Sequence, residues 1–168
     1  SLALALACLF GAPKPIRDQA ASLFGAAATN ALRAALPHFP GRWDVLPLVV
    51  ERRSISAQIA ERLELSADAA PAAILAELQR RSSDRGLLLI LDELGRGLEA
   101  AADGEGDIYL LQDIAELASR SQGRLIILGV LHQAFEEYAE RLSRKVRDSW
   151  AKIQGRYVDI SISVSLEE

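Results

Sequence analysis

The 168-residue sequence contains no methionine and only one cysteine, Cys8. A single cysteine cannot close an internal disulfide, and no Cys/His spacing typical of a zinc site is present. No apolar run approaches the roughly 20 residues that a bilayer-spanning helix needs. These absences exclude disulfide-stapled, zinc-finger and membrane-spanning classes. We therefore expect a cytoplasmic protein in which Cys8 is a small core residue.

The sequence also has little excess charge of either sign. Nineteen basic and twenty-three acidic side chains give a net charge of −4, which offers no overall attraction to nucleic acid or to an anionic membrane. Half of the residues are apolar, and the length suits one domain over residues 1–168 with a sizeable core.

The first residues, SLALALACLFGAP, allow two interpretations. They could be a secretory signal whose Ala5–Cys8 ending imitates a lipoprotein cleavage site, or a buried helix that Gly11 and Pro13 end. A signal needs a positively charged segment before its apolar core, and none stands before Ser1. We expect the helix, packed under a sheet, and because methionine is absent we expect the sequence to be part of a longer chain.

Further along, apolar strand patterns alternate with helical ones. Leu87–Leu91 is a run of five aliphatic residues, which is typical of a strand buried on both faces of a parallel sheet. Pro47 favours an edge position or a bulge for the first strand. The expected strands are Trp43–Glu51, Leu87–Leu91, Leu125–Val130 and Tyr157–Val164. The expected helices run from Ser54 or Ser56 to Leu65, over Ile74–Leu78, from Asp107 to Gly123, and from Phe135 to Val146.

This alternation predicts an α/β fold with a mostly parallel sheet and helices on both faces. In such sheets ligands bind beyond the carboxyl ends of the strands, and Asp92 and Glu93 directly follow Leu87–Leu91. In phosphoryl transfer one carboxylate holds the Mg²⁺ shell while a second orients or deprotonates the attacking water. We assign the metal role to Asp92 and the base role to Glu93. The alternative is that Asp92 caps a turn and Glu93 is a solvated acid at a helix start.

The segment LLLILDEL resembles the Walker B strand of P-loop ATPases of the AAA-like and STAND-like kind. SLALALACLFG resembles the helix that follows the phosphate loop of that family. Together with GDIYLLQDIAELASRSQG, LHQAFEEYAERLS and WAKIQGRYVDI, the chain resembles the ATPase core of large bacterial ATP-binding proteins, some of them associated with phage defence. The resemblance covers most of Gly86–Ile160 and, more loosely, Ser1–Gly11.

The resemblance implies a chain that binds ATP and Mg²⁺ and couples hydrolysis to a conformational change. The glycine-rich loop would end at or just before Ser1, which would then contribute to nucleotide binding. The first strand of the family would precede Ser1 and lie between Leu125–Val130 and Tyr157–Val164. Partners beyond ATP would be further copies or other domains of the parent chain.

Three further positions match places where the family has functional residues. His132 and Gln133 follow the strand Leu125–Val130, where such ATPases place a polar sensor of the γ-phosphate or the attacking water. A loop histidine with no such role is the alternative. Arg156 precedes the last strand, from where a guanidinium could reach phosphate in its own or a neighbouring subunit, unless it is an ordinary surface arginine.

Other functions stay open on the sequence. Trp150 and the basic residues near it could form a small nucleic-acid patch; these residues are Arg141, Arg144, Lys145, Arg147 and Lys152. The i,i+4 spacings of Glu137 with Arg141 and of Glu140 with Arg144 favour a solvated helix face instead. A metal-dependent nuclease would need a further carboxylate, for which only Asp159 offers itself. A scaffold domain that keeps the sheet without the chemistry is the main alternative. The segment 13–42 carries no chemistry that we can interpret.

Overall fold

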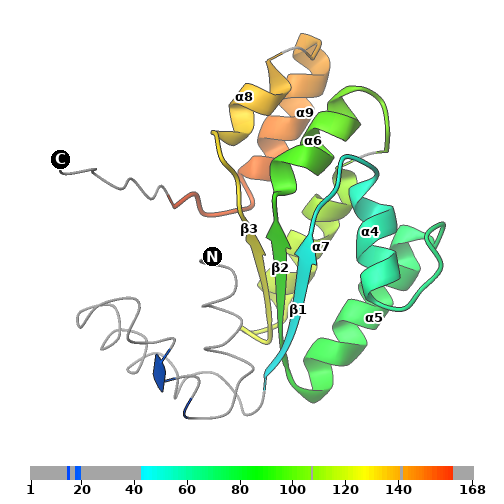
Figure 1. The fold of residues 1–168 in the computed structure, drawn as a ribbon, viewed down its shortest axis with the longest axis vertical. Helices are drawn as coiled ribbons and strands as arrows, with labels where there is room; N and C mark the ends of the chain where they lie inside the picture. Colours follow the sequence, from blue (N-terminus) through cyan, green and yellow to red (C-terminus); the bar gives the residue numbers. More distant parts are fainter. Residues whose placement is uncertain (1–14, 16–17, 20–42, 107, 141, 161–168) are drawn as a thin grey trace.

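A computed structural model describes residues 15, 18–19, 43–106, 108–140 and 142–160 of the chain (Figure 1). The expected helix Ser1–Gly11, its site residue Ser1 and most of the segment 13–42 lie outside these residues. So do Asp107, the expected cap of a helix, and the second half of the expected strand Tyr157–Val164.

Three parallel strands form the sheet of the described residues. They are β1 (Trp43–Val49), β2 (Gly86–Asp92) and β3 (Leu125–Gly129), in the order β1-β2-β3 (Figure 1). The register places Val49 opposite Asp92 and Leu91 opposite Gly129, so the carboxyl ends of all three strands meet at one edge. Strand β1, which contains Pro47, lies at the edge of this sheet, as that proline predicts. The expected α/β class with a parallel sheet is confirmed.

Six helices accompany these strands among the residues that the structure describes between 43 and 160. They are α4 (Ile55–Arg62), α5 (Pro71–Asp84), α6 (Leu94–Ala102), α7 (Tyr109–Arg120), α8 (Phe135–Ala139) and α9 (Arg144–Gln154). Of the two serines proposed as the cap of the first of them, Ser54 takes the position, and its hydroxyl accepts the backbone N–H of Ala57.

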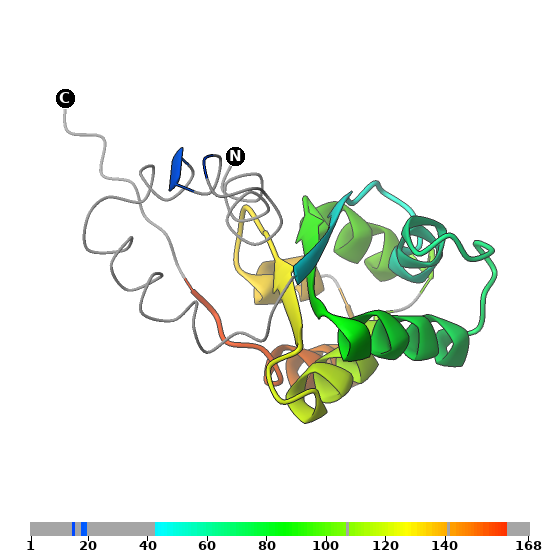
Figure 2. The same cartoon turned by 90° about the horizontal axis from the view of Figure 1, so that it is seen from below.

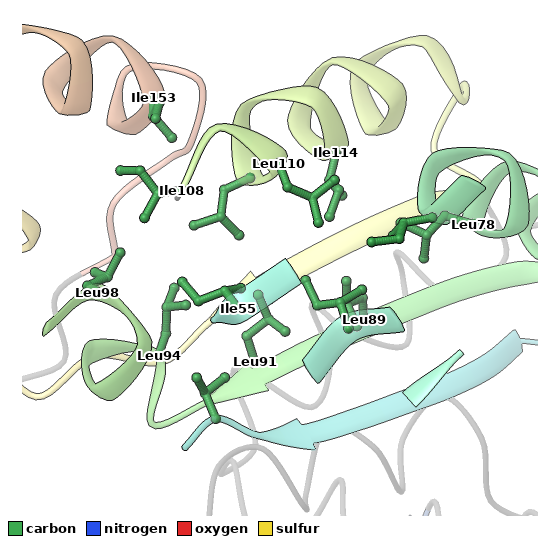
Figure 3. Packing of buried hydrophobic residues seen from close by; sticks show 14 of the residues in the cluster. Ile55, Leu78, Leu89, Leu91, Leu94, Leu98, Ile108, Leu110, Ile114 and Ile153 are labelled. Atoms are coloured by element: carbon green, nitrogen blue, oxygen red, sulfur yellow. The ribbon is translucent and has the colours of Figure 1, made fainter. Parts of the chain in front are cut away.

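All six helices contribute to one core on one face of the sheet. Leu89 and Leu91 of β2 point toward Leu110 and Ile114 of α7 (Figure 3). Figure 2 shows α5, α7 and α9 on the same side of the strands. The alternate residues of β2, Leu88 and Ile90, are equally buried but cluster with strand residues only. Within the described part of the chain, helices therefore cover one face of the sheet, and the expectation of helices on both faces stays a prediction.

Two expected elements differ from the structure, and one helix is additional. Helix α6 directly follows β2 and is expected only in the alternative that makes Glu93 an acid at a helix start. The expected helix Phe135–Val146 is two helices, because α8 ends at Ala139 and α9 starts after Ser143, with Phe135 packed against Trp150 at a ring-centroid distance of 5.7 Å.

The expected last strand is also wrong in its described part, Tyr157–Ile160, which forms no strand. The hydroxyl of Tyr157 donates to the backbone oxygen of Leu111 at 2.6 Å, which ties this segment to α7 instead of the sheet. Val158 and Ile160 are consequently 87% and 78% exposed.

Glu77 of α5 should make the fold sensitive to acid. Its carboxylate accepts hydrogen bonds from Arg80 and Arg81, and Arg81 also donates to the backbone oxygen of Leu63 after α4. The hydrogen bonds from Arg80 and then Arg81 lower the pKa of Glu77 to about 2. A lowered folded-state pKa adds stability above the ordinary pKa of 4.5, and this stability is lost as the pH falls toward 2. We expect denaturant midpoints to fall less steeply between pH 4.5 and 2 in Glu77→Gln than in the wild type; equal slopes would contradict the assignment.

Candidate functional site

The candidate site lies at the carboxyl edge of the central strand β2. Hydrogen bonds between backbones continue past the strand ends and hold the following segments side by side. The N–H of Val130 donates to Leu91 O at 2.9 Å, the N–H of Leu94 to Val130 O at 3.0 Å, and the N–H of Val50 to Asp92 O at 2.8 Å. The residues after β2 and β3 therefore occupy fixed positions next to each other.

Asp92 and Glu93 form the turn from β2 into α6. Glu93 is the residue before the helix and adopts a left-handed backbone conformation, with φ 58° and ψ 32°. That conformation costs a residue with a side chain roughly 1 to 2 kcal/mol. One compensating contact is the backbone N–H of Glu93, which donates to Asp92 Oδ1 at 3.1 Å. Strained backbone positions of this kind cluster at functional sites, so the conformation of Glu93 favours a functional role for this turn.

The Glu93 carboxylate is shared between two basic side chains. The Nε2 atom of His132 lies 2.9 Å from Oε1, and Arg96 Nε lies 3.4 Å from Oε2. An ionised carboxylate only accepts hydrogen bonds, so His132 donates from Nε2. The hydrogen bond from His132 and, more weakly, the charges of His132 and Arg96 lower the pKa of Glu93 against the opposing effect of desolvation. Glu93 is therefore an ionised, oriented carboxylate at neutral pH.

The structure thus brings together three of the residues predicted for the site. Asp92 is the last residue of the central strand, Glu93 follows it, and His132 reaches Glu93 from the loop after the neighbouring strand β3. Gln133 follows His132 in the chain and is exposed.

Arg156 is not brought to this group. Its guanidinium pairs with Glu116 of α7 at 2.8 Å, and it borders an open cavity of about 370 Å³ lined by Ala115, Glu116, Ser119 and Arg120. Glu116 lies seven residues into α7, or about 10 Å along the helix axis at 1.5 Å per residue. Helix α7 leads back to the amino end of β3, so its later residues lie away from the carboxyl edge of the sheet. The ion pair with Glu116 therefore keeps Arg156 away from Asp92 and Glu93. The expectation that Arg156 reaches a phosphate in its own subunit gains no support from this position.

Sequence reasoning missed three residues that shape the site. Arg96 was recognisable only by its i,i+3 spacing from Glu93. No sequence motif marks Gly95 or Tyr138 as a site residue. Their role follows from packing, because a Cβ atom at Gly95 would lie 2.2 Å from the Tyr138 hydroxyl.

The structure argues against the nucleic-acid interpretation, because Trp150 is not accessible for stacking on a base. Trp150 is buried against Phe135, so its ring is not available to a base. The expected helix pair of Glu140 and Arg144 is also not formed, since the break between α8 and α9 separates the two residues. Asp159, the candidate third carboxylate of a nuclease, accepts a hydrogen bond from Gln154 at the end of α9. Among the described residues, no group of three or more His, Cys, Asp or Glu side chains could hold a metal ion.

Comparisons with known proteins add no relative. No protein-family model matches the sequence, and neither the curated proteins nor the solved structures contain a match. None of the helices in the described part of the chain has the length and apolar character needed to cross a membrane.

Proposed function

We propose that the full-length protein binds Mg-ATP at the carboxyl edge of the sheet and hydrolyses it to drive a conformational change. The observation that carries this proposal is the Glu93 carboxylate, which directly follows the central strand of the parallel sheet and is hydrogen-bonded to His132 in the loop after the neighbouring strand. Ligands of open parallel sheets bind at this edge. A scaffold domain without nucleotide chemistry is the competing possibility.

The residues present fit a hydrated magnesium ion better than a cage of protein ligands. Mg²⁺ usually keeps several waters and takes one or two carboxylates together with substrate phosphates. Asp92 supplies one such carboxylate and is half-buried at the strand end. Ser1, which the family resemblance places beside a phosphate loop, lies outside the described residues. The fit to a magnesium ion therefore concerns Asp92 and Glu93.

Asp92, Glu93 and His132 have different roles in this proposal. When bound, Mg-ATP supplies the phosphoryl group and the cation that neutralises its charge. Asp92 would hold the cation through its carboxylate. Glu93 orients the attacking water and accepts its proton, and His132 keeps the Glu93 carboxylate in one orientation through the 2.9 Å hydrogen bond.

A magnesium titration of ATP hydrolysis tests this proposal. We expect the full-length wild type to hydrolyse ATP in a Mg²⁺-dependent manner. Asp92→Ala should raise the Mg²⁺ concentration required by at least about tenfold, the scale on which the loss of groups around a metal site acts. Asp44→Ala is the matched control, because Asp44 lies at the opposite end of the sheet and is an exposed partner of Arg85.

This experiment tests ATP hydrolysis by the protein and the metal-binding role of Asp92 separately. A wild type without Mg²⁺-dependent hydrolysis would favour the scaffold function. An active wild type whose Mg²⁺ response is unchanged by Asp92→Ala would make Asp92 a structural residue of the turn before α6.

A further inference from the structure

Gln58 of α4 has a polar side chain that is buried in the described part of the chain. It is 1% exposed, and its amide group is hydrogen-bonded at both its oxygen and its nitrogen. The Oε1 atom accepts the backbone N–H of Glu51 at 2.7 Å, and the Nε2 atom donates to Glu51 O at 3.1 Å. This exchange of two hydrogen bonds resembles that of paired residues in a sheet. Gln58 therefore continues the hydrogen bonding of β1 beyond its last residue, Val49.

The same amide fixes the rest of the segment that joins β1 to α4. Its Nε2 atom also donates to Arg53 O at 3.0 Å and to Ser54 O at 3.3 Å. An amide nitrogen carries two N–H donors, so the three carbonyl oxygens share them. One buried side chain thus holds the backbone of Glu51, Arg53 and Ser54, which leaves this segment little conformational freedom.

Val50, the residue directly before Glu51, contacts the candidate site at two places. Its backbone N–H donates to Asp92 O at 2.8 Å. Its side chain is fully buried, and a Cβ atom at Gly97 of α6 would lie 2.9 Å from its Cγ1 atom. Figure 1 shows the segment from β1 to α4 passing beside α6. The position of Val50 therefore bears on the turn that carries Asp92 and on the helix that follows it.

We propose that Gln58 is a positioning residue for the metal site. By holding the backbone of Glu51, it keeps Val50 against Asp92 and α6, and so fixes the turn that presents the Asp92 carboxylate. The effect of Gln58 on the Mg²⁺ dependence of ATP hydrolysis rests on the proposed function. Its effect on the end of β1 does not, and the two effects are measured separately.

The test compares Gln58→Met with Ser82→Ala in the full-length protein. Methionine is unbranched like glutamine and fills a similar space, but it cannot make these hydrogen bonds. Ser82 of α5 is also buried and donates to Gln79 O of its own helix at 3.1 Å, so its loss does not touch the segment after β1. Both variants are measured at a temperature at which circular dichroism shows them folded. Gln58→Asn, which keeps the amide on a shorter side chain, takes the place of Gln58→Met if the latter does not fold.

In the Gln58 variant we expect amide hydrogen exchange without nucleotide to be about 5- to 10-fold faster at Glu51, the scale of one lost hydrogen bond. Exchange at Val50 should also be faster. The amide of Leu87, which donates to Arg124 O at the amino end of β2, is the internal reference and should not change. We expect the Mg²⁺ concentration for half-maximal ATP hydrolysis to rise about tenfold, the lower end of the effect of groups that orient metal ligands. Ser82→Ala should leave both measurements at the wild-type values.

Unchanged exchange at Glu51 or at Val50 in the Gln58 variant would show that Gln58 does not hold the end of β1. Faster exchange at both residues, with a Mg²⁺ response equal to that of Ser82→Ala, would overturn the positioning of the metal site. If the wild type does not hydrolyse ATP, the proposed function fails, and the exchange measurement still decides whether Gln58 fixes the end of β1.

Discussion

Glu93→Gln is expected to retain ATP binding and to lose hydrolysis by about 10²- to 10⁴-fold, the usual contribution of a positioned general base. The substituted amide has nearly the shape of the carboxylate, and its oxygen still accepts the hydrogen bond from His132. It cannot accept a proton from water. The substitution therefore removes the chemistry while leaving the arrangement of the turn and of α6 intact.

Glu99→Gln provides the matched control for this variant. Glu99 lies on the same helix, is about half exposed, and faces Arg52 at 3.8 Å without contacting the site. Nucleotide binding and steady-state hydrolysis should be measured for both variants and the wild type. Turnover of Glu93→Gln within about twofold of the Glu99→Gln value would remove Glu93 as the base, whatever the fate of the other site residues.

Much of this pairing could be foreseen from the sequence. Five consecutive aliphatic residues in Leu87–Leu91 predict a doubly buried parallel strand, and Asp92 and Glu93 at its end place two carboxylates at the ligand edge. His132 follows the next strand along the chain, so its proximity to Glu93 follows from the neighbouring positions of the two strands. The hydrogen bond between them could not be foreseen, because it depends on the left-handed turn at Glu93.

The apolar pattern of the sequence does not predict helix α6, and the reason is its glycine content. Gly95 and Gly97 each lower intrinsic helix propensity by about 1 kcal/mol relative to alanine, so the local sequence argues against a helix there. The structure keeps both glycines inside a helix because other side chains occupy the space of their missing Cβ atoms. Tyr138 lies over Gly95, and Ile55 lies over Gly97. Tertiary packing outweighs local propensity in this segment.

The errors after β3 have a similar origin. The 3-4-4 apolar spacing of Phe135, Tyr138, Leu142 and Val146 fits one helix. In the structure α8 ends at Ala139, a second helix starts at Arg144, and the two helices pack together where Phe135 contacts Trp150. Periodicity reports which residues are apolar and not whether the helix is continuous. The position of Arg156 likewise depends on its ion pair with Glu116, a contact forty residues away in the sequence that no local pattern encodes.

Gly97→Leu is expected to destabilise the fold, although leucine is among the best helix formers. A Cβ atom at Gly97 would lie 2.4 Å from Ile55 Cγ1 and 2.9 Å from Val50 Cγ1, and both of these side chains are fully buried. The larger side chain would have to displace the contact between α6 and the segment joining β1 to α4. We expect a loss of about 3 kcal/mol, at the upper end of the usual cost of overpacking, and a Tm lower by roughly 6 to 12 °C.

A graded series separates this packing effect from helix propensity. Gly97→Ala should lower the Tm less than Gly97→Leu, because its single methyl group needs a smaller displacement of Ile55. Glu99→Leu introduces leucine at an exposed position of the same helix and should change stability by no more than about 0.5 kcal/mol. If propensity governed the site, both Gly97 variants would melt at or above the wild-type temperature. That result in calorimetry would mean that α6 does not pack against Val50 and Ile55, and the segment that positions Glu93 would have to be placed differently.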